Sequence, residues 1–218
     1  MSRQFDLLVF DWDGTLMDST GMIARSIQRA FLDVGLVAPS DKDARFVIGY
    51  GLHEAMQHLG PQLNAEQIQR IVDAYRGHFL TQDHELQLYP GVEAGLLRLQ
   101  AAGFRMAVAT GKSRAGLDRV LAATGLSPFF EVSRTADEAF SKPHPAMLEY
   151  ILDACDIEGH RALMIGDTTH DLQLAINAGT ASVALSYGAH SLEELLSLQP
   201  LAHFDDFSRL TDWILAHG

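Results

Sequence analysis

Residues 7–16 of the chain read LLVFDWDGTL, an apolar run that ends in acidic residues and a glycine. Four apolar residues in a row, among them Val9 and Phe10, are typical of a buried strand, and Asp-x-Asp-Gly is typical of a turn. Asp11 and Asp13 lie two residues apart in an extended segment, so we expect their side chains to point the same way. The segment therefore predicts a buried strand with two carboxylates at its carboxyl end.

Further apolar runs of similar length predict more strands. Three strong runs and a weaker fourth lie at 106–109, 162–165, 181–185 and 129–132. Helical patterns separate these runs: one ends at Gly125, one opens with Pro145 as its first residue, and one ends at Gly179. Strands that alternate with helices and are apolar on both faces predict a doubly wound parallel sheet of the α/β class.

The stretch 18–83 contains no strand run of comparable strength. Two amphipathic helical patterns occur in it, over 23–34 and 68–79, and the segment between them is broken by glycine and proline. We therefore predict an all-helical domain of residues 18–83 inserted into an α/β core made of residues 1–17 and 84–218. The chain crosses between the two parts only twice, and this predicts a hinge.

The charge balance of the chain limits its partners. Among 218 residues, 16 are Lys or Arg and 28 are Asp or Glu, which gives a net charge of −12. Nucleic acid and anionic membranes both require a basic face for non-specific binding, so we expect neither as a partner. An anionic substrate would need positive charge brought to it locally, by lysines, helix N-termini or a metal ion.

Cysteine content and hydropathy bear on the compartment. The single cysteine, Cys155, excludes an internal disulfide and any zinc site built from cysteines. No apolar run approaches the roughly 20 residues of a membrane-spanning helix. The first residues, MSRQFD, lack the apolar core of a signal peptide. We expect a cytoplasmic protein that is a monomer or a homodimer.

Polar residues follow three of the predicted strands, at the edge where parallel sheets bind ligands. In chain order they are Asp11 and Asp13, then Thr110, Gly111 and Lys112, then Asp167 and Asp171. Carboxylates that converge on one cleft raise each other's pKa, and Mg²⁺, which prefers oxygen ligands, removes their repulsion. Lys142, before a predicted helix, or Lys112 would face a phosphate, with Thr110 and free backbone amides as further donors. The set fits phosphoryl transfer.

Taken together and in order, these motifs resemble those of the haloacid dehalogenase superfamily. Residues 11–16, DWDGTL, are similar to its nucleophile motif, and Thr110 matches the Ser or Thr after its second strand. Lys142 in SKPHP is similar to its lysine motif, and residues 166–171, GDTTHD, to its acidic motif. The helical insert looks like the type 1 cap of this superfamily. The chain resembles the phosphoglycolate phosphatase-like members of subfamily IA.

The resemblance implies a Mg²⁺-dependent phosphatase acting on a small phosphorylated metabolite of the phosphoglycolate type. Asp11 would attack phosphorus and form an aspartyl-phosphate, and Asp13 would protonate the leaving oxygen and then activate water. The carboxylates of Asp11 and Asp167 and the backbone carbonyl of Asp13 would bind Mg²⁺. Asp171 would orient Lys142 or a water on the metal. A carboxylate nucleophile divides one difficult hydrolysis into two easier steps.

The resemblance also suggests which residues complete the site. Thr110 and Lys142 join the catalytic set, and Gly111 and Lys112 lie beside them as candidates for substrate binding. Candidate substrate-binding residues of the cap are Arg45, Tyr50 and His53. An ordinary surface loop accounts for the cap residues equally well, and a solvated lysine accounts for Lys112.

Two alternatives share these motifs. A sugar phosphomutase of the β-phosphoglucomutase type has all four, but it would move phosphate within a sugar and not release it. A binding protein on an inactive phosphatase fold is disfavoured, because Asp11, Asp13 and the other motif residues are all present. His144 and His170 neighbour the motifs without a partner at metal-ligand spacing, and we expect both to face solvent.

Overall fold

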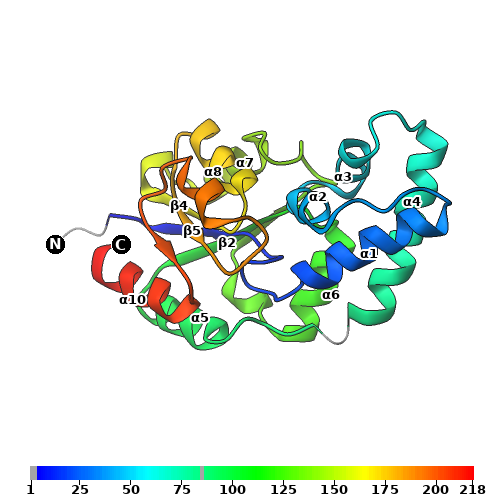
Figure 1. The fold of residues 1–218 in the computed structure, drawn as a ribbon. Helices are drawn as coiled ribbons and strands as arrows, with labels where there is room; N and C mark the ends of the chain where they lie inside the picture. The colour runs from blue at the N-terminus through cyan, green and yellow to red at the C-terminus, as the bar shows by residue number, and fades with distance from the viewer. Residues whose placement is uncertain (1–3, 84–85) are drawn as a thin grey trace.

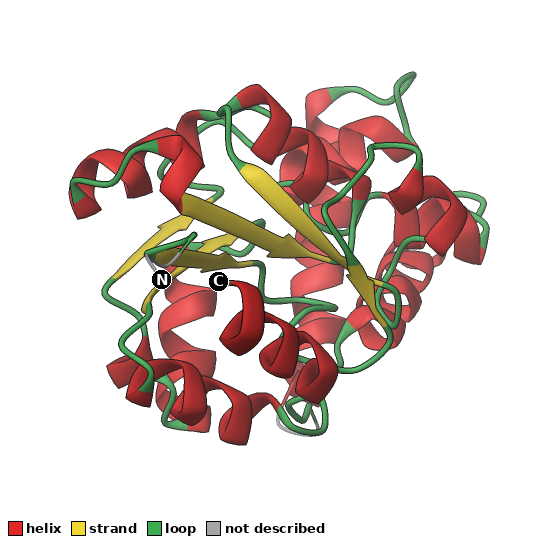
Figure 2. Cartoon of the chain, turned by 90° about the vertical axis from the view of Figure 1, so that its left-hand side faces the viewer, coloured by secondary structure: helices red, strands yellow, loops and turns green. Residues whose placement is uncertain are grey.

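A six-stranded parallel sheet forms the centre of the computed structural model, with helices on both of its faces (Figure 1, Figure 2). The strand order is β3-β2-β1-β4-β5-β6, so β1 (Leu7–Phe10) lies in the interior of the sheet. Leu7 of β1 lies opposite Arg105 of β2 and Ala162 of β4. The predicted doubly wound α/β core is confirmed.

The structure describes residues 4–83 and 86–218. Residues 1–3 and 84–85, where the two predicted segments of the core begin, lie outside the described residues. Among the helices that are described, none is long and apolar enough to cross a membrane.

All four strong apolar runs lie in strands, and the weak run at 129–132 was misplaced. The strands after β1 are β2 (Arg105–Thr110), β3 (Val132–Thr135), β4 (Ala162–Gly166), β5 (Ala181–Leu185) and β6 (His203–Phe204). The prediction of a strand over 129–132 was wrong. Phe129 ends a 3₁₀ turn, η2 (Ser127–Phe129), and the edge strand starts at Val132, where the polar sequence VSRT gives little signal.

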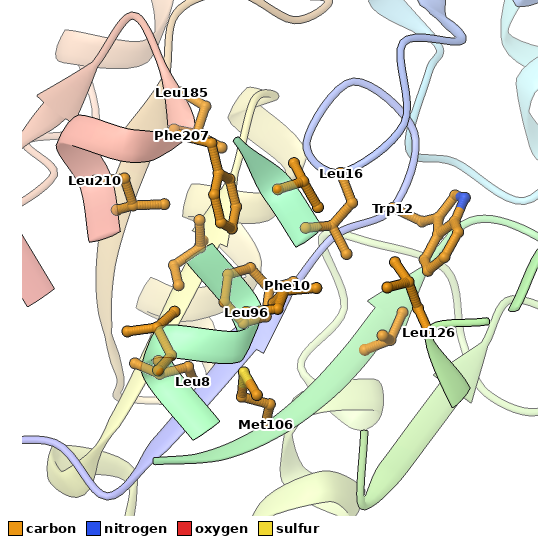
Figure 3. Close-up of a cluster of buried hydrophobic side chains, with 14 of the residues drawn as sticks. Leu8, Phe10, Trp12, Leu16, Leu96, Met106, Leu126, Leu185, Phe207 and Leu210 are labelled. Carbon is orange, nitrogen blue, oxygen red and sulfur yellow. The ribbon is translucent and has the colours of Figure 1, made fainter. Parts of the chain in front are cut away.

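Alternate side chains of β1 enter two different cores. Leu8 and Phe10 pack with the face formed by α5, α6 and α10, and Leu7 and Val9 pack with α7 and α8. Figure 3 shows Leu8 and Phe10 surrounded by side chains of the first core, including Phe207 of α10. The helices of the α/β part are α5 (Val92–Ala101), α6 (Arg114–Thr124), α7 (Ala146–Cys155), α8 (Thr169–Asn177), α9 (Leu192–Leu196) and α10 (Phe207–His217), with a 3₁₀ turn η3 (Gly159–Arg161) before β4.

Capping residues set the helix ends that the sequence predicted. The hydroxyl of Ser113 accepts the amide hydrogen of Gly116 at the start of α6, and Gly125 ends that helix in the left-handed region at φ 71°. Helix α7 begins one residue later than predicted, because Pro145 is its N-cap and Ala146 its first residue. Proline is tolerated at either position, because the first amide groups of a helix have no intrahelical acceptor.

Four helices between β1 and α5 form a separate module on the right in Figure 1. They are α1 (Thr20–Asp33), α2 (Asp41–Phe46), α3 (Leu52–Leu59) and α4 (Ala65–Gln82). Their apolar faces share a core of their own, in which Ile27 of α1 and Ile71 of α4 are buried. The sequence predicted α1 and α4 but not α2 and α3. The latter two are short helices in a segment that contains several glycines, so they leave little periodic pattern. We refer to residues 20–82 as the cap.

The two chain crossings between cap and core lie side by side. The amide of Asp18 donates to the carbonyl of Gln87 at 2.9 Å, and the amide of Tyr89 donates to the carbonyl of Leu16 at 2.9 Å. Met17 and Leu88 form an antiparallel bridge between the same segments. The two crossings therefore pair with each other over a few residues, the arrangement a hinge would need.

Candidate active site

The motif residues meet at the carboxyl edge of the sheet. Asp11 directly follows β1, Thr110 is the last residue of β2, and Asp167 directly follows β4. These three strands are neighbours in the sheet, because β1 lies between β2 and β4. Parallel strands end at the same edge, and this brings together side chains that are far apart in the sequence.

Asp11 is buried and only partly paired. Its side chain is 1% exposed, and its Oδ1 lies 2.8 Å from Nζ of Lys142. Among the described residues its Oδ2 has no hydrogen-bond partner. Burial raises the pKa of Asp11 to about 7, against the opposing effect of the Lys142 charge. A buried carboxylate oxygen without a partner is uncommon and suggests a ligand that the polypeptide does not itself supply.

Lys142 lies between two carboxylates. Its Nζ is 2.8 Å from Oδ1 of Asp11 and 2.6 Å from Oδ1 of Asp171, and the side chain is fully buried. Burial disfavours the charge of Lys142, but the two carboxylates outweigh that effect and raise its pKa. Thr168 donates through its amide and its hydroxyl to the other Asp171 oxygen in the capping box of α8. The lysine is thus charged and fixed in position.

Asp167 is held by the backbone and by a hydroxyl. Thr15 donates its hydroxyl to Oδ1 at 2.7 Å, and the amide of Ala189 donates to Oδ2 at 2.7 Å. A Cβ at Gly14 or at Gly188 would overlap this carboxylate, so both glycines are needed for the close approach. Burial, followed by the negative charges of Asp11 and Asp171, raises the pKa of Asp167 well above its usual range.

The buried acids fit a divalent metal ion. Asp11, Asp167 and Asp171 each offer an oxygen, and these oxygens lie within 4.8 Å of one another. Lys142 and Thr168 contact the two oxygens of Asp171, and Thr15 and Ala189 contact those of Asp167. Oδ2 of Asp11 is the carboxylate oxygen of this cluster that has no partner among the described residues. An all-oxygen donor set is the type that Mg²⁺ prefers, and a cation there would offset the repulsion that raises the pKa of Asp167.

Asp13 lies at the edge of this cluster and is held on two sides. Ser19 donates its hydroxyl to Oδ1 of Asp13 at 2.6 Å, and Nζ of Lys112 lies 3.0 Å from the same oxygen. The Lys112 ammonium also sits over the ring of Phe79, 5.0 Å from its centroid. Thr110, which is fully buried, accepts the amide hydrogen of Lys112 at 3.2 Å and keeps its own hydroxyl proton for another acceptor.

A cavity of about 690 Å³ opens next to Asp11 and Asp13, between cap and core. Four of the predicted substrate-binding residues line it: Tyr50, His53, Gly111 and Lys112. Arg45 does not. Its guanidinium pairs with Asp41 at 2.8 Å and donates to Thr20 at 3.2 Å, and it borders a different, smaller cavity. The structure therefore does not bring Arg45 to the cavity that contains the catalytic candidates.

The cap loop before α3 is docked on the core by close backbone contacts. The amide of Gly51 donates to the hydroxyl of Ser141 at 2.6 Å. A Cβ at Gly111 would overlap the carbonyl groups of Gly49 and Tyr50, so only glycine allows this approach. Residues of the second and third motifs thereby position the loop that carries Tyr50.

The prediction that His170 faces solvent was wrong, whereas His144 is exposed as predicted. His170 is 4% exposed, stacks on Tyr50 with ring centroids 4.0 Å apart, and donates from Nε2 to the carbonyl of Phe46 at 2.6 Å. His190 reaches the same carbonyl at 3.1 Å, while its Nδ1 accepts the amide hydrogen of Thr169. Burial lowers the pKa of His170 to about 4 and also lowers that of His190.

Several residues that support the site were not predicted from the sequence, although Thr15 and Ser141 lie inside its motifs. Ser19 and Thr15 support two of the acids, Ser141 holds the cap loop, and Ala189 contributes only its backbone amide. The position of Ala189 could have been found, because residues 186–190 follow β5 at the same sheet edge as the motifs. A hydroxyl or an amide in a loop is otherwise too common to stand out.

The chain matches the family model described as haloacid dehalogenase-like hydrolase over residues 8–185. Among curated proteins it is 33% identical over 210 residues to the "Probable phosphatase IndB" of Dickeya dadantii, which covers 94% of this chain and 91% of the relative. It is 31% identical over 227 residues to the phosphoglycolate phosphatase of Vibrio cholerae, covering 98% of each chain.

Solved structures show the same fold. A protein described as a predicted phosphoglycolate phosphatase from Haemophilus somnus superposes with a TM-score of 0.86 and 28% identity, covering 98% of this chain and 99% of that one. The "Putative beta-phosphoglucomutase from Bacteroides vulgatus" superposes with a TM-score of 0.87 over 99% of this chain and 91% of that one, at 22% identity, so this likeness concerns the fold alone. The chain belongs to the haloacid dehalogenase-like hydrolase family, within which it is similar to phosphoglycolate phosphatases.

Proposed function

We propose that this hydrolase is a Mg²⁺-dependent phosphatase that releases phosphate from a small phosphorylated metabolite through an aspartyl-phosphate on Asp11. The observation that carries the proposal is the buried Asp11 carboxylate, which borders the cavity and whose Oδ2 has no hydrogen-bond partner in the described part of the chain. The relatives named phosphatase support the reaction class. Phosphoglycolate, the compound in the name of the Vibrio cholerae relative, is the first substrate to test.

Asp11 and Asp13 would divide the hydrolysis into two steps. An Asp11 oxygen attacks phosphorus, and the bond from phosphorus to the ester oxygen breaks while Asp13 protonates that oxygen. Asp13 then takes a proton from water, the water oxygen attacks phosphorus, and the bond from phosphorus to Asp11 breaks. The hydrogen bond from Ser19 and the ammonium of Lys112 hold Asp13 beside the cavity for both transfers.

Positive charge for the phosphate would come from a metal and two lysines. The carboxylates of Asp11 and Asp167 and the backbone carbonyl of Asp13 would hold Mg²⁺, which when bound neutralises phosphate and carboxylate charge. Lys142, fixed by Asp171, would face the phosphate beside Asp11, and the free hydroxyl proton of Thr110 would donate to it. These contacts position the phosphate, the main requirement of phosphoryl transfer.

The test is phosphate release from a panel of phosphorylated metabolites, measured with Mg²⁺ and with EDTA. The panel contains phosphoglycolate, sugar phosphates, nucleoside monophosphates and an aryl phosphate. We expect Mg²⁺-dependent release that Asp11→Asn lowers by at least about a thousandfold, since the amide cannot act as nucleophile. Far-UV circular dichroism of Asp11→Asn should match that of the unmodified chain.

Two outcomes would contradict the proposal. Full activity of Asp11→Asn would exclude Asp11 as the nucleophile. Interconversion of glucose phosphates without phosphate release would show a phosphomutase, the alternative that shares the same motifs.

Size-exclusion chromatography would decide between the predicted monomer and homodimer.

A further inference from the structure

The cap side of the cavity is mainly apolar. Ile27 of α1, Leu52 and Met56 of α3, and Tyr75, Phe79 and Leu80 of α4 all line it. Cavities that bind small molecules combine such a lining with a few polar groups that fix the orientation of the ligand. Here the polar groups, Asp11 and Asp13, lie at the phosphate end. The apolar side chains therefore face whatever is attached to the phosphate.

The charges of the cavity do not favour a second anionic group on the substrate. Among its described lining residues, Arg76 pairs with Asp73 at 3.7 Å and Arg119 with Asp83 at 2.9 Å. The third cation, Lys112, is committed to the phosphate end by its contact with Asp13.

Acidic lining residues outside the catalytic pair also disfavour a second anionic group on the substrate. Glu54 and Asp137 also line the cavity. The carboxylate of a phosphorylated acid such as phosphoglycolate would meet these negative charges, and each arginine of the described lining would have to leave its own acidic partner to receive it. Like charges brought together in a partly desolvated site are costly.

The volume of the cavity also disfavours a substrate as small as phosphoglycolate. About 690 Å³ lies within the range of cavities that enclose drug-sized ligands. A two-carbon acid on the phosphate would leave much of this space to water held against apolar side chains, which is unfavourable. An alcohol that carries a ring or a branched chain would fill it.

We propose that the preferred substrate is a phosphomonoester whose alcohol carries a bulky, uncharged apolar group, aromatic or cycloaliphatic, that binds against α1, α3 and α4. This inference rests on the proposed phosphatase activity and specifies its substrate class. Phe79 and Leu80 line the cavity on α4 and act as specificity residues. Burial of their contact area with the substrate supplies the preference.

The experiment compares four esters of primary alcohols, so that the leaving groups are similar: ethyl phosphate, phosphoglycolate, 2-phenylethyl phosphate and 2-cyclohexylethyl phosphate. The readout is kcat/KM for phosphate release with saturating Mg²⁺. We expect both ring-bearing esters to exceed ethyl phosphate by about tenfold to a hundredfold, the range for one apolar group in a complementary pocket. We expect phosphoglycolate not to exceed ethyl phosphate.

Three variants locate the effect. Phe79→Ala should lower the ratio of kcat/KM for 2-phenylethyl over ethyl phosphate by about tenfold. Because Phe79 is 6% exposed and this variant could misfold, Leu80→Ser is the second variant, at a side chain that is 48% exposed. Leu97→Ser is the matched control, since Leu97 on α5 is 51% exposed and lies outside the cavity lining. It should leave the ratio unchanged.

The outcomes separate this inference from the function on which it rests. If ethyl phosphate or phosphoglycolate matches or exceeds the ring-bearing esters, the chain is a phosphatase but the proposed substrate class is wrong. If Leu97→Ser lowers the ratio as much as Leu80→Ser, the apolar cavity is not the cause. If no ester releases phosphate, the proposed phosphatase function fails, and the substrate class fails with it.

Discussion

Lys142 shows how one buried charge organises the site. Its ammonium is fully buried, with Asp11 at 2.8 Å and Asp171 at 2.6 Å. Burying such a charge is costly unless it is paired, and here one cation offsets part of the repulsion among three buried carboxylates. The long side chain of Lys142 reaches both acids from the loop before α7.

Lys142→Met should destabilise the fold strongly in the absence of metal. The change keeps the apolar stem but leaves Asp11 and Asp171 without their shared partner, and breaking a buried pair costs about 3–5 kcal/mol. Urea denaturation in EDTA measures the loss. Lys42→Met is the matched control, because the Lys42 side chain is 81% exposed and 3.6 Å from Glu194. It should cost less than about 0.5 kcal/mol, and equal losses in the two variants would contradict the prediction.

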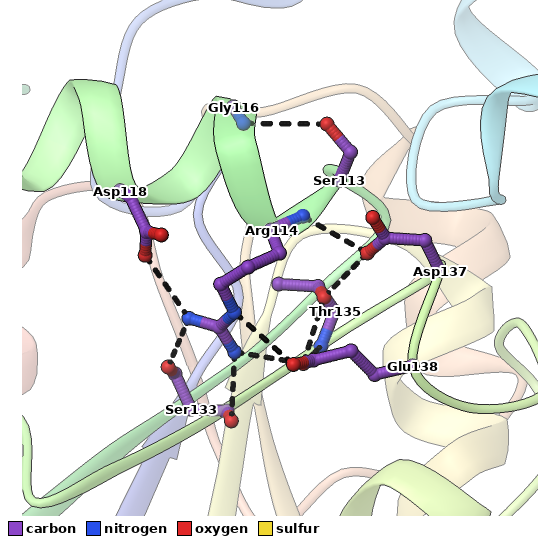
Figure 4. A network of polar contacts seen from close by, with 8 residues as sticks. All are labelled: Ser113, Arg114, Gly116, Asp118, Ser133, Thr135, Asp137 and Glu138. Atoms are coloured by element: carbon purple, nitrogen blue, oxygen red, sulfur yellow. Dashed lines mark hydrogen bonds and ion pairs between the residues drawn. The ribbon is translucent and has the colours of Figure 1, made fainter.

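At the scale of elements, Arg114 fastens the start of α6 to the loop after β3 (Figure 4). Its guanidinium donates to Glu138 at 2.8 Å and to the hydroxyl and carbonyl of Ser133 at 2.9 and 3.1 Å. Its amide donates to Asp137 at 2.9 Å. Because Ser113 and Asp137 line the cavity, this network fixes one of its walls.

The Arg114 network makes stability depend on pH in a defined direction. The hydrogen bond from Arg114 lowers the pKa of Glu138 from 4.5 to about 2. A carboxylate with a lowered pKa contributes stability that is present above pH 4.5 and is lost as the pH falls toward 2.

Glu138→Gln should therefore lower the free energy of unfolding at pH 7 by about 1 kcal/mol, a value reduced because the side chain is 29% exposed. The difference from the unmodified chain should shrink as the pH is lowered below 4.5 in urea titrations. Asp118→Asn is the control on the same arginine, with a side chain that is 60% exposed, and should change little. A loss of unfolding free energy that does not change with pH would contradict the role given to the ion pair between Glu138 and Arg114.

Docking of the cap loop depends on a glycine of the core. Gly111→Ala would place a Cβ against the carbonyls of Gly49 and Tyr50 and push the loop away from the sheet. We expect KM to rise and kcat to fall in steady-state assays. Gly77→Ala on α4 is the matched control: a Cβ there meets no atom within 4 Å, so it should raise stability by about 0.5–1 kcal/mol and preserve activity. Equal kinetic effects of both variants would contradict the loop contact.

At the scale of the whole molecule, negative charge gathers where cap and core meet the sheet edge. The chain carries a net charge of −12, and Asp11, Asp167 and Asp171 are buried within 4.8 Å of one another. Their mutual repulsion opposes folding in the absence of a cation and favours binding of one. The proposed metal site and the stability of the fold therefore depend on the same cluster of charges.

Mg²⁺ should raise the melting temperature. A ligand that binds only the folded state stabilises it by mass action, and at about a hundred times the Kd the gain is about 2.7 kcal/mol. Thermal denaturation with MgCl₂ and with NaCl at the same ionic strength separates binding from screening. The gain should be smaller in Asp167→Asn, which removes one proposed ligand. A melting temperature that rises equally with NaCl would contradict a specific site.

Local patterns predicted most of the core. The runs at 7–10, 106–109, 162–165 and 181–185 all lie in strands, because a buried strand shows its character in consecutive residues. The edge strand β3 and the two-residue β6 carried too little apolar sequence to be recognised or placed. Motif order likewise identified the residues that meet at the sheet edge, since strands of a parallel sheet end together.

The sequence by itself determined the class of fold, the two longer inserted helices α1 and α4, and the acids and lysines of the motifs, because these follow from periodicity and residue type. Only the tertiary structure decided which cap residues reach the cavity. Arg45 is drawn away by Asp41 and Thr20, whereas His170 is buried against Tyr50. The burial of His170 depends on a contact between residues more than a hundred positions apart, that between His170 and Phe46, where packing and not local pattern selects the partner.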